Sequence, residues 1–129
     1  MICIVDTFAW VEYFIGSSKG AILKKNLSEK NNRHITMECC LTELVGYCKK
    51  NNKDYRPIIG IVKANSVLLP VTQELWIKAA QIRFRLRKKV KNFGLVDAII
   101  AAKQEDLKCK IITGDPHFKT LKNVIYLGN

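Results

Sequence analysis

The chain has 129 residues, of which 48% are hydrophobic, and it carries 22 Lys and Arg against 11 Asp and Glu. This length predicts a single domain with an ordinary hydrophobic core. No apolar run approaches the roughly 20 residues of a membrane span, and Asp6 ends the apolar start of the chain too early for a secretory signal. We therefore expect a soluble, cytoplasmic protein with no membrane partner.

The net charge of +11 predicts a polyanionic partner, because side chains that neutralise phosphates release counterions and so gain affinity. A basic surface that only keeps the protein in solution is the alternative. The five cysteines are an odd number without a C-x-x-C pair, which is typical of reduced core thiols. This spacing does not favour a zinc site, whose ligands usually occur in spaced pairs.

Short apolar runs alternate with helical patterns along the first half of the chain. A wholly apolar strand is typical of a parallel sheet covered by helices on both faces, and a glycine often ends a helix. In chain order we expect a strand at 1–5, a helix at 7–15 that ends at Gly16, a helix capped by Ser17 or Ser18, a strand at 34–37 and a helix at 40–48.

The second half continues this alternation. Pro70 implies that the strand near it ends there or lies at an edge of the sheet, and Thr72 is a suitable cap for a long helix. Gly94 separates that helix from the next one, which contains Asp97. The expected elements are a helix at 57–63, a strand at 67–71, a long helix after Thr72, a helix around Asp97, and strands at 110–113 and 124–127.

Strands that alternate with helices predict an α/β fold, a three-layer α/β/α sandwich with a mainly parallel central sheet. Sites in such folds form beyond the carboxyl ends of the strands. Asp6 and Asp115 each follow a predicted strand, and Asp97 lies near the start of an apolar helix. Glu43 lies at the edge of a helical stripe. If these four acids share one cleft, they form a candidate site.

Four carboxylates in one cleft need a countercharge. Two unit charges 4 Å apart repel by about 1 kcal/mol in water and by about 4 kcal/mol at an effective dielectric constant of 20. A hard divalent cation supplies the countercharge, and oxygen ligands without spaced His or Cys favour Mg²⁺ or Mn²⁺ over zinc. Each acid taken alone also has an ordinary interpretation, as a turn former, a helix cap, a first-turn residue or an exposed salt-bridge partner.

Four blocks of the sequence together resemble a PIN-domain nuclease, and within that family the chain is most similar to the compact VapC-type toxins of toxin–antitoxin pairs. The blocks are ICIVDT at 2–7, LTEL at 41–44, GLVDAIIAA at 94–102, and IITGD at 111–115 followed by His117 and Phe118. They span almost the whole chain, so residues 1–129 would form one PIN-like domain. The resemblance implies an Mg²⁺- or Mn²⁺-dependent endoribonuclease whose metal-binding and catalytic acids are Asp6, Glu43, Asp97 and Asp115.

The resemblance also implies accessory residues. Thr7 and Thr113 match hydroxyl positions beside the first and last acids, although capping and strand propensity would explain them equally well. Many relatives carry another acid after the last one, whereas Pro116 and His117 stand here. The number of metals, one or two, therefore stays open, and His117 itself is interpreted as a loop histidine.

A homodimer and a small antitoxin are the protein partners that the resemblance implies. The aromatic side chains of the first helix, Trp10, Tyr13 and Phe14, would serve either core packing or an interface. RNA is the expected substrate, and we predict that its backbone follows the basic cluster at the end of the long helix. The members of this cluster are Arg83, Arg85, Arg87, Lys88, Lys89 and Lys91.

The function predicted from the sequence is hydrolysis of RNA phosphodiester bonds by metal-activated water, as the toxin of a VapBC-type pair. The alternative is a non-catalytic RNA-binding or RNA-processing PIN-like module. A response-regulator-like phosphoacceptor is less favoured, because it would have an acidic pair directly after the first strand, and Asp6 is followed by Thr7 and Phe8. No motif encodes the RNA target.

Overall fold

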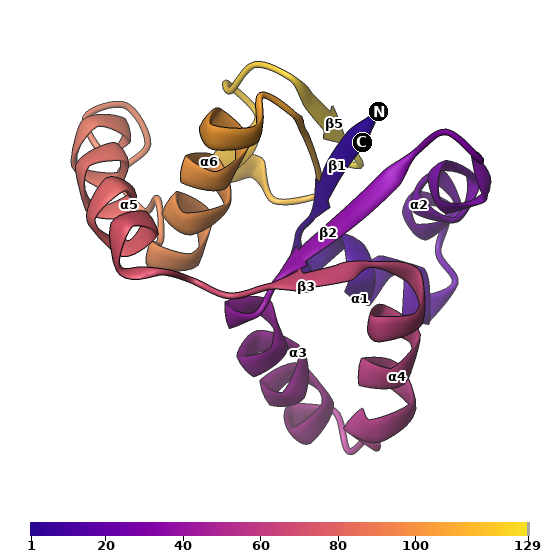
Figure 1. Cartoon of the computed structure of the whole chain (residues 1–129). Helices are drawn as coiled ribbons and strands as arrows, with labels where there is room; N and C mark the ends of the chain where they lie inside the picture. Colours follow the sequence, from indigo (N-terminus) through magenta and orange to yellow (C-terminus); the bar gives the residue numbers. More distant parts are fainter. Residues whose placement is uncertain (129) are drawn as a thin grey trace.

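The computed structural model describes residues 1–128, which form a five-stranded sheet with helices on both faces (Figure 1). The strand order is β3-β2-β1-β4-β5, and every neighbouring pair is parallel. All carboxyl ends therefore lie along one edge of the sheet. The strands are β1 (Ile2–Val5), β2 (Arg33–Met37), β3 (Val67–Leu69), β4 (Lys110–Thr113) and β5 (Val124–Tyr126).

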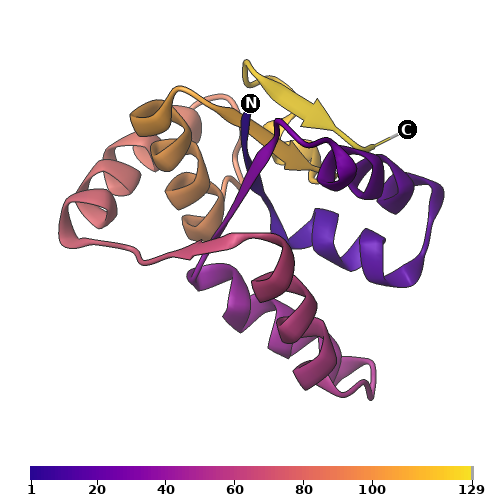
Figure 2. The ribbon, with the colours of Figure 1, turned by 45° about the vertical axis from the view of Figure 1, so that its right-hand side comes forward.

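Six α-helices cover the sheet. They are α1 (Thr7–Ile15), α2 (Ser18–Ser28), α3 (Cys39–Lys50), α4 (Tyr55–Asn65), α5 (Gln73–Leu86) and α6 (Leu95–Leu107), and a short 3₁₀ helix η1 (Pro116–Phe118) follows β4. Two views show α5 and α6 side by side on one face, while α1 to α4 lie on the other (Figures 1 and 2). The three-layer parallel α/β fold predicted from the sequence is confirmed.

The central strands are buried on both faces because alternate side chains point to opposite sides of a strand. Ile4 of β1 and Ile111 of β4 pack in the core beneath α5 and α6. Val5 and Ile112, one residue further along, pack in the second core beneath α1 to α4. The unbroken apolar runs of β1 and β4 are thus explained by burial on both faces.

The capping predictions hold at Ser17 and Thr72, whose side chains accept hydrogen bonds from backbone N–H groups of the first turns of α2 and α5. Several element boundaries differ from the prediction by one or two residues. β3 ends at Leu69 because Pro70 has no N–H to continue the ladder. The fourth helix begins at Tyr55, ahead of the predicted 57–63, because Asp54 caps it, and the last strand ends at Tyr126.

The polypeptide between β1 and β2 folds back on itself as a pair of helices. Gly16 ends α1 in the left-handed conformation at φ 77°, which glycine adopts without strain. A Cβ atom at Gly20 would lie only 2.2 Å from the Glu12 carbonyl oxygen, so glycine there lets α2 pack directly on α1. Within residues 1–128, no helix is both long and apolar enough to cross a membrane.

Candidate metal centre

All four predicted acids line one hollow of about 330 Å³ at the carboxyl edge of the sheet. Asp6 follows β1 and Asp115 follows β4, and these two strands are neighbours. Glu43 comes from the second turn of α3, and Asp97 is the third residue of α6. The other residues that line the hollow are Thr7, Phe8, Val11 and Tyr47.

Asp6 is the most deeply buried of the four acids, with 4% of the residue exposed. One carboxylate oxygen accepts the N–H of Thr7 at 2.8 Å, and the other accepts the Thr113 hydroxyl at 2.7 Å. Burial raises the pKa of Asp6 to about 7, and the charges of Asp97 and Glu43 add to the rise. The hydrogen bond from Thr113 acts in the other direction and lowers this pKa, but its effect is smaller than that of burial. The charged form is therefore destabilised, and a cation bound here would stabilise it.

The two threonines each fix a carboxylate. The Thr7 hydroxyl donates to Glu43 Oε1 at 2.7 Å, which turns this side chain toward the hollow. The Thr113 hydroxyl donates to Asp6 and also accepts the Asp115 N–H at 3.0 Å. Burial raises the pKa of Glu43, and the negative charges of Asp97 and Asp115 raise it further. Both threonines thus have defined contacts in the site beyond capping or strand propensity.

Asp97 lies in the first turn of α6, where its side chain is 13% exposed. Its Oδ2 accepts the Gly94 N–H at 2.9 Å, so Asp97 serves as part of the helix cap. The same oxygen lies 3.0 Å from His117 Nδ1. One side chain therefore both caps the helix and belongs to the acid cluster. The five residues that follow it in α6, from Ala98 to Ala102, are buried in the core.

His117, which the sequence led us to interpret as a loop histidine, has its ring against two acids of this site. Its backbone N–H donates to Asp115 Oδ1 at 2.9 Å, and this turn brings its ring to Asp97 and to within 3.6 Å of Asp115. The hydrogen bond with Asp97 raises the pKa of His117, and the charge of Asp115 adds to this. The sequence feature that points to this contact is the D-P-H spacing. An Asp side chain often accepts the backbone N–H of the second residue after it, and the resulting turn brings that residue close to the Asp.

The donor set of the hollow fits a hard divalent cation. Carboxylate oxygens suit Mg²⁺ and Mn²⁺, and no Lys or Arg of residues 1–128 lines this hollow to supply the positive charge instead. Asp97, Asp115 and His117 bring one ligand atom each within 4.8 Å of one another. An imidazole nitrogen in this group is a better ligand for Mn²⁺ than for Mg²⁺.

A second group, in which Cys40 joins Asp6 and Glu43, also gathers ligand atoms within 4.8 Å. A hydrogen bond with Cys39, together with burial, raises the pKa of the Cys40 thiol well above its usual value. The sulfur therefore stays protonated at neutral pH, and only a thiolate is a strong metal ligand. The two acids are the useful donors of this group.

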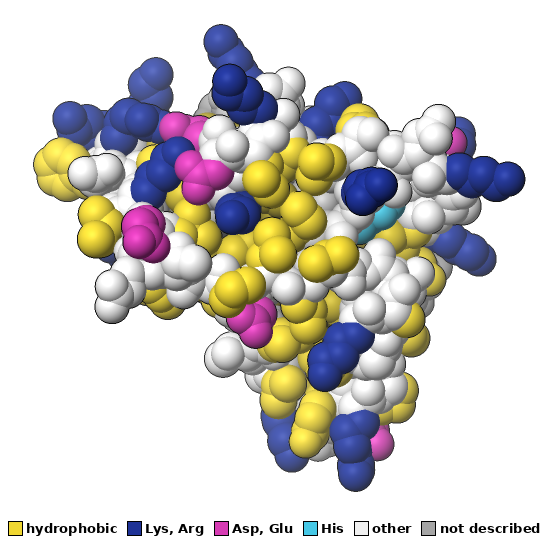
Figure 3. Space-filling view, in the orientation of Figure 1, with side chains coloured by type: hydrophobic (Ala, Val, Ile, Leu, Met, Phe, Trp, Pro, Cys, Tyr) yellow, Lys and Arg dark blue, Asp and Glu magenta, His cyan; other side chains and the backbone are white. Residues whose placement is uncertain are grey.

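The predicted RNA-binding cluster lies apart from the acid hollow, and none of its six members lines that hollow. Lys and Arg side chains gather over the far end of α5 in the space-filling view (Figure 3). Arg85 pairs with Glu105 at 3.1 Å in the last turn of α6, whereas Asp97 lies in the first turn of that helix. Eight residues of helix, about 12 Å, separate these two positions.

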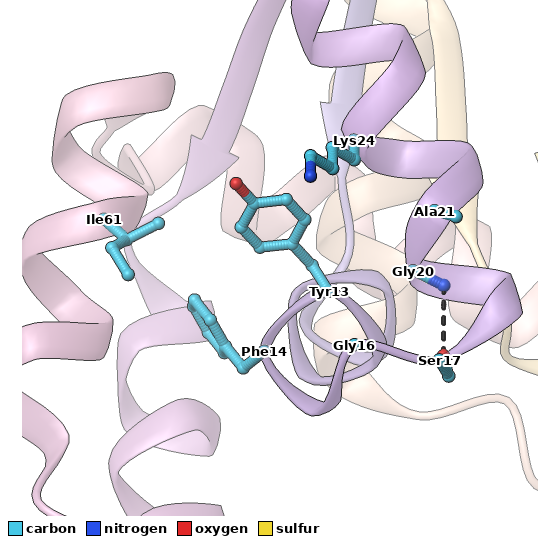
Figure 4. A pocket seen from close by; sticks show the side chains of 8 residues that line it. All are labelled: Tyr13, Phe14, Gly16, Ser17, Gly20, Ala21, Lys24 and Ile61. Carbon is cyan, nitrogen blue, oxygen red and sulfur yellow. Dashed lines mark hydrogen bonds between the residues drawn. The ribbon is translucent and has the colours of Figure 1, made fainter.

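A further hollow of about 440 Å³ lies between α1, α2 and α4 and shares no residue with the acid hollow. Figure 4 shows the rings of Tyr13 and Phe14 facing Ile61 across it, with Lys24 near the Tyr13 hydroxyl. Trp10 of the same helix is fully buried and donates its indole N–H to Thr36 at 3.0 Å. Of the three aromatic residues, Trp10 lies within the core, and the other two are partly buried against that core while they line this hollow.

A parallel α/β sheet with carboxylates gathered beyond the ends of β1 and β4 defines a protein with a candidate metal centre. Residues 3–124 match the family model described as the PIN domain, and the chain belongs to the PIN domain family. A comparison with curated proteins found no match to the chain.

Several solved structures share the fold. VapBC2 from Rickettsia felis, solved with a DNA fragment of its promoter, is similar with a TM-score of 0.74 and 20% identity, covering 98% of this chain and 97% of that one. VapC20 of Mycobacterium tuberculosis, a sarcin–ricin loop cleaving toxin, has a TM-score of 0.73 at 17% identity, covering 95% and 96%. DNA-bound VapBC from Salmonella typhimurium has a TM-score of 0.70 at 18% identity, covering 98% of each chain. At these identities the likeness establishes the fold.

Proposed function

We propose that this protein is a metal-dependent endoribonuclease and the toxin of a VapBC-type toxin–antitoxin pair. The observation that supports this most strongly is the convergence of Asp6, Glu43, Asp97 and Asp115 on one hollow of a PIN domain. RNA is the proposed substrate because the chain carries a net charge of +11, which favours a polyanionic partner, and shares its fold with a toxin described as cleaving the sarcin–ricin loop.

A bound Mg²⁺ or Mn²⁺ would supply water activation, polarisation of a phosphoryl oxygen and stabilisation of the leaving oxygen. Asp6, Asp97 and Asp115 would hold the cation, and Glu43 would bind it or orient water. Asp6 must release its proton to do so, and its raised pKa makes this release part of metal binding.

The hydrogen bonds of the two threonines would serve the reaction by positioning. Thr113 holds Asp6 and the backbone of Asp115 in one arrangement, and Thr7 holds Glu43. Oxygens that are fixed before substrate binds need no costly reorganisation during the reaction. The six basic residues of the α5 end would bind phosphates of the RNA backbone and contribute affinity without sequence specificity.

Cleavage of single-stranded RNA with and without Mg²⁺ or Mn²⁺ tests the proposal. We expect cleavage that EDTA abolishes and that the Asp6→Asn and Asp97→Asn variants lose while still binding RNA. Glu29→Gln is a matched control, because Glu29 is exposed and lies outside the acid hollow. Binding without cleavage by the wild-type protein across several RNAs would favour the non-catalytic RNA-binding module instead.

The antitoxin and the homodimer are proposed on the likeness to the VapBC structures. A short reading frame for a DNA-binding protein beside this gene would support the antitoxin, and co-purification of the two products would test it. Light scattering of the isolated protein tests the homodimer. A mass of one chain at micromolar concentration would contradict the dimer without bearing on cleavage.

A further inference from the structure

An aromatic side chain stands exposed among cations at the end of α5. Phe84 is 74% exposed, the highest value among the exposed large hydrophobic residues. It lines a hollow of about 400 Å³ together with Ala80, Arg83, Arg87 and Lys88. Leaving an aromatic ring in water forgoes the free energy of its burial, so this position has no explanation in the packing of the domain.

Within residues 1–128, the cations Arg83, Arg87 and Lys88 around Phe84 have no carboxylate partner. The ion pairs that α5 makes are those of Lys78 and Arg85. The Nε of Arg83 is buried and makes no hydrogen bond within the described chain. Arg87 donates its Nε–H to the carbonyl of Lys91 at 3.0 Å, which leaves the end of its guanidinium for other contacts. The Lys88 ammonium lies 5.3 Å from the centre of the Phe84 ring.

We propose that Phe84 is a stacking platform for an unpaired RNA base, and that Arg83, Arg87 and Lys88 bind the phosphates beside it. The inference rests on the proposed function, and it specifies that the RNA bound here is single-stranded. Every base offers a flat face to an aromatic ring once it is unstacked, whereas a duplex keeps these faces covered. An exposed ring bordered by cations combines base stacking with charge neutralisation.

A second copy of the chain fits this surface less well than RNA does. A two-fold contact centred on this patch places the same side chains of both subunits together. Arg83, Arg87 and Lys88 would then face the same three cations of the copy, and like charges in an interface are unfavourable. RNA brings phosphates instead. Because the patch and the acid hollow share no residue, the platform would bind a nucleotide other than the one cleaved.

Fluorescence anisotropy of a labelled single-stranded RNA in EDTA, which prevents cleavage, tests the platform. We expect Phe84→Ala to weaken binding by about 5- to 150-fold, the range for loss of one stacked base, and Phe84→Trp to retain it. Ile77→Ala is the matched control, because Ile77 is 64% exposed on the same helix but does not line this hollow. Arg87→Ala should weaken binding and reduce the slope of log affinity against log salt by about one.

Three results would overturn the proposal. Phe84→Ala could bind single-stranded RNA as the wild type does, or it could lose affinity for inorganic polyphosphate, which has no bases, by the same factor as for RNA. It could also change the molecular mass in light scattering while RNA affinity stays constant, which would assign the patch to an interface between copies. If Phe84→Ala loses RNA affinity but the wild type cleaves no RNA, the platform stands and the nuclease proposal fails.

Discussion

Asp6→Asn should make the metal-free protein more stable at neutral and alkaline pH. Asp6 is buried beside Asp97 and Glu43, so its charged form is opposed by burial and by two like charges. Asparagine has nearly the same shape and carries no charge. Its carbonyl can accept the Thr7 N–H, and its amide can donate to the Thr113 hydroxyl oxygen in place of the present bond.

The sign and size of the effect follow from the pKa of Asp6, which is about 7 in the folded protein against an ordinary value of 3.8. The folded state holds this proton more tightly than the unfolded state, so the free energy of unfolding falls as pH rises from about 4 to 7. The full shift corresponds to about 4 kcal/mol. Reorganised hydrogen bonds cost about 1 kcal/mol, which leaves a gain of about 3 kcal/mol at pH 8.

Urea unfolding in EDTA at pH 5 and pH 8 measures this gain. Asp6→Asn should be more stable than the wild type at pH 8, and the difference should shrink at pH 5, where Asp6 is mostly protonated. Asp54→Asn is the control for which we expect the opposite change, a loss of stability at pH 8. The Arg56 backbone N–H donates to the Asp54 carboxylate, and this hydrogen bond lowers the pKa of Asp54. A variant that is no more stable at pH 8 than the wild type would refute the electrostatic account of the hollow.

Other predictions concern the neighbours of Asp6. Thr113→Val removes the hydroxyl that donates to Asp6 and should destabilise the protein by about 1–3 kcal/mol in urea at pH 8, whereas Thr113→Ser should recover most of the loss. Asp97→Asn should lower the pKa of His117 in an NMR titration, because the hydrogen bond to Asp97 raises it, and an unchanged pKa would argue against this contact in solution. His117→Ala should lose more affinity for Mn²⁺, measured by paramagnetic resonance, than for Mg²⁺, measured by calorimetry, because imidazole is the better ligand for Mn²⁺. Equal losses of affinity for the two ions would contradict a ligand role for the imidazole.

The fold was predictable because its signals are local. The apolar runs of β1 and β4 have no polar face, which only burial on both sides of a parallel sheet explains. Pro70 limited β3, and Ser17 and Thr72 marked helix starts. The errors were at boundaries where one side chain decides, as at Asp54, which caps α4 ahead of the predicted start.

The site was predictable only in part. Asp6 and Asp115 follow from their places at strand ends, but the hydrogen bonds of Thr7 and Thr113 depend on side-chain orientation across elements distant in sequence. His117 reaches Asp97 through a turn that composition does not reveal. The basic cluster was visible in the sequence, yet its separation from the acid hollow required the positions of α5 and α6.

The place of Phe84 on α5 could have been read from the helical spacing. Leu75, Ala79, Ile82 and Leu86 recur at the spacing of one helical face, and the structure packs this face into the core with α6. Phe84 lies off that face, but its 74% exposure and the hollow beside it required the structure.

The most direct test of the central claim is the rate at which the purified protein cleaves single-stranded RNA as Mn²⁺ is titrated, with the Asp6→Asn, Asp97→Asn double variant alongside it. The account predicts metal-dependent cleavage by the wild type, and a double variant that binds the same RNA but does not cut it. Equal cleavage by the two proteins, or cleavage by the wild type that persists in EDTA, would contradict a carboxylate-held metal as the catalytic centre.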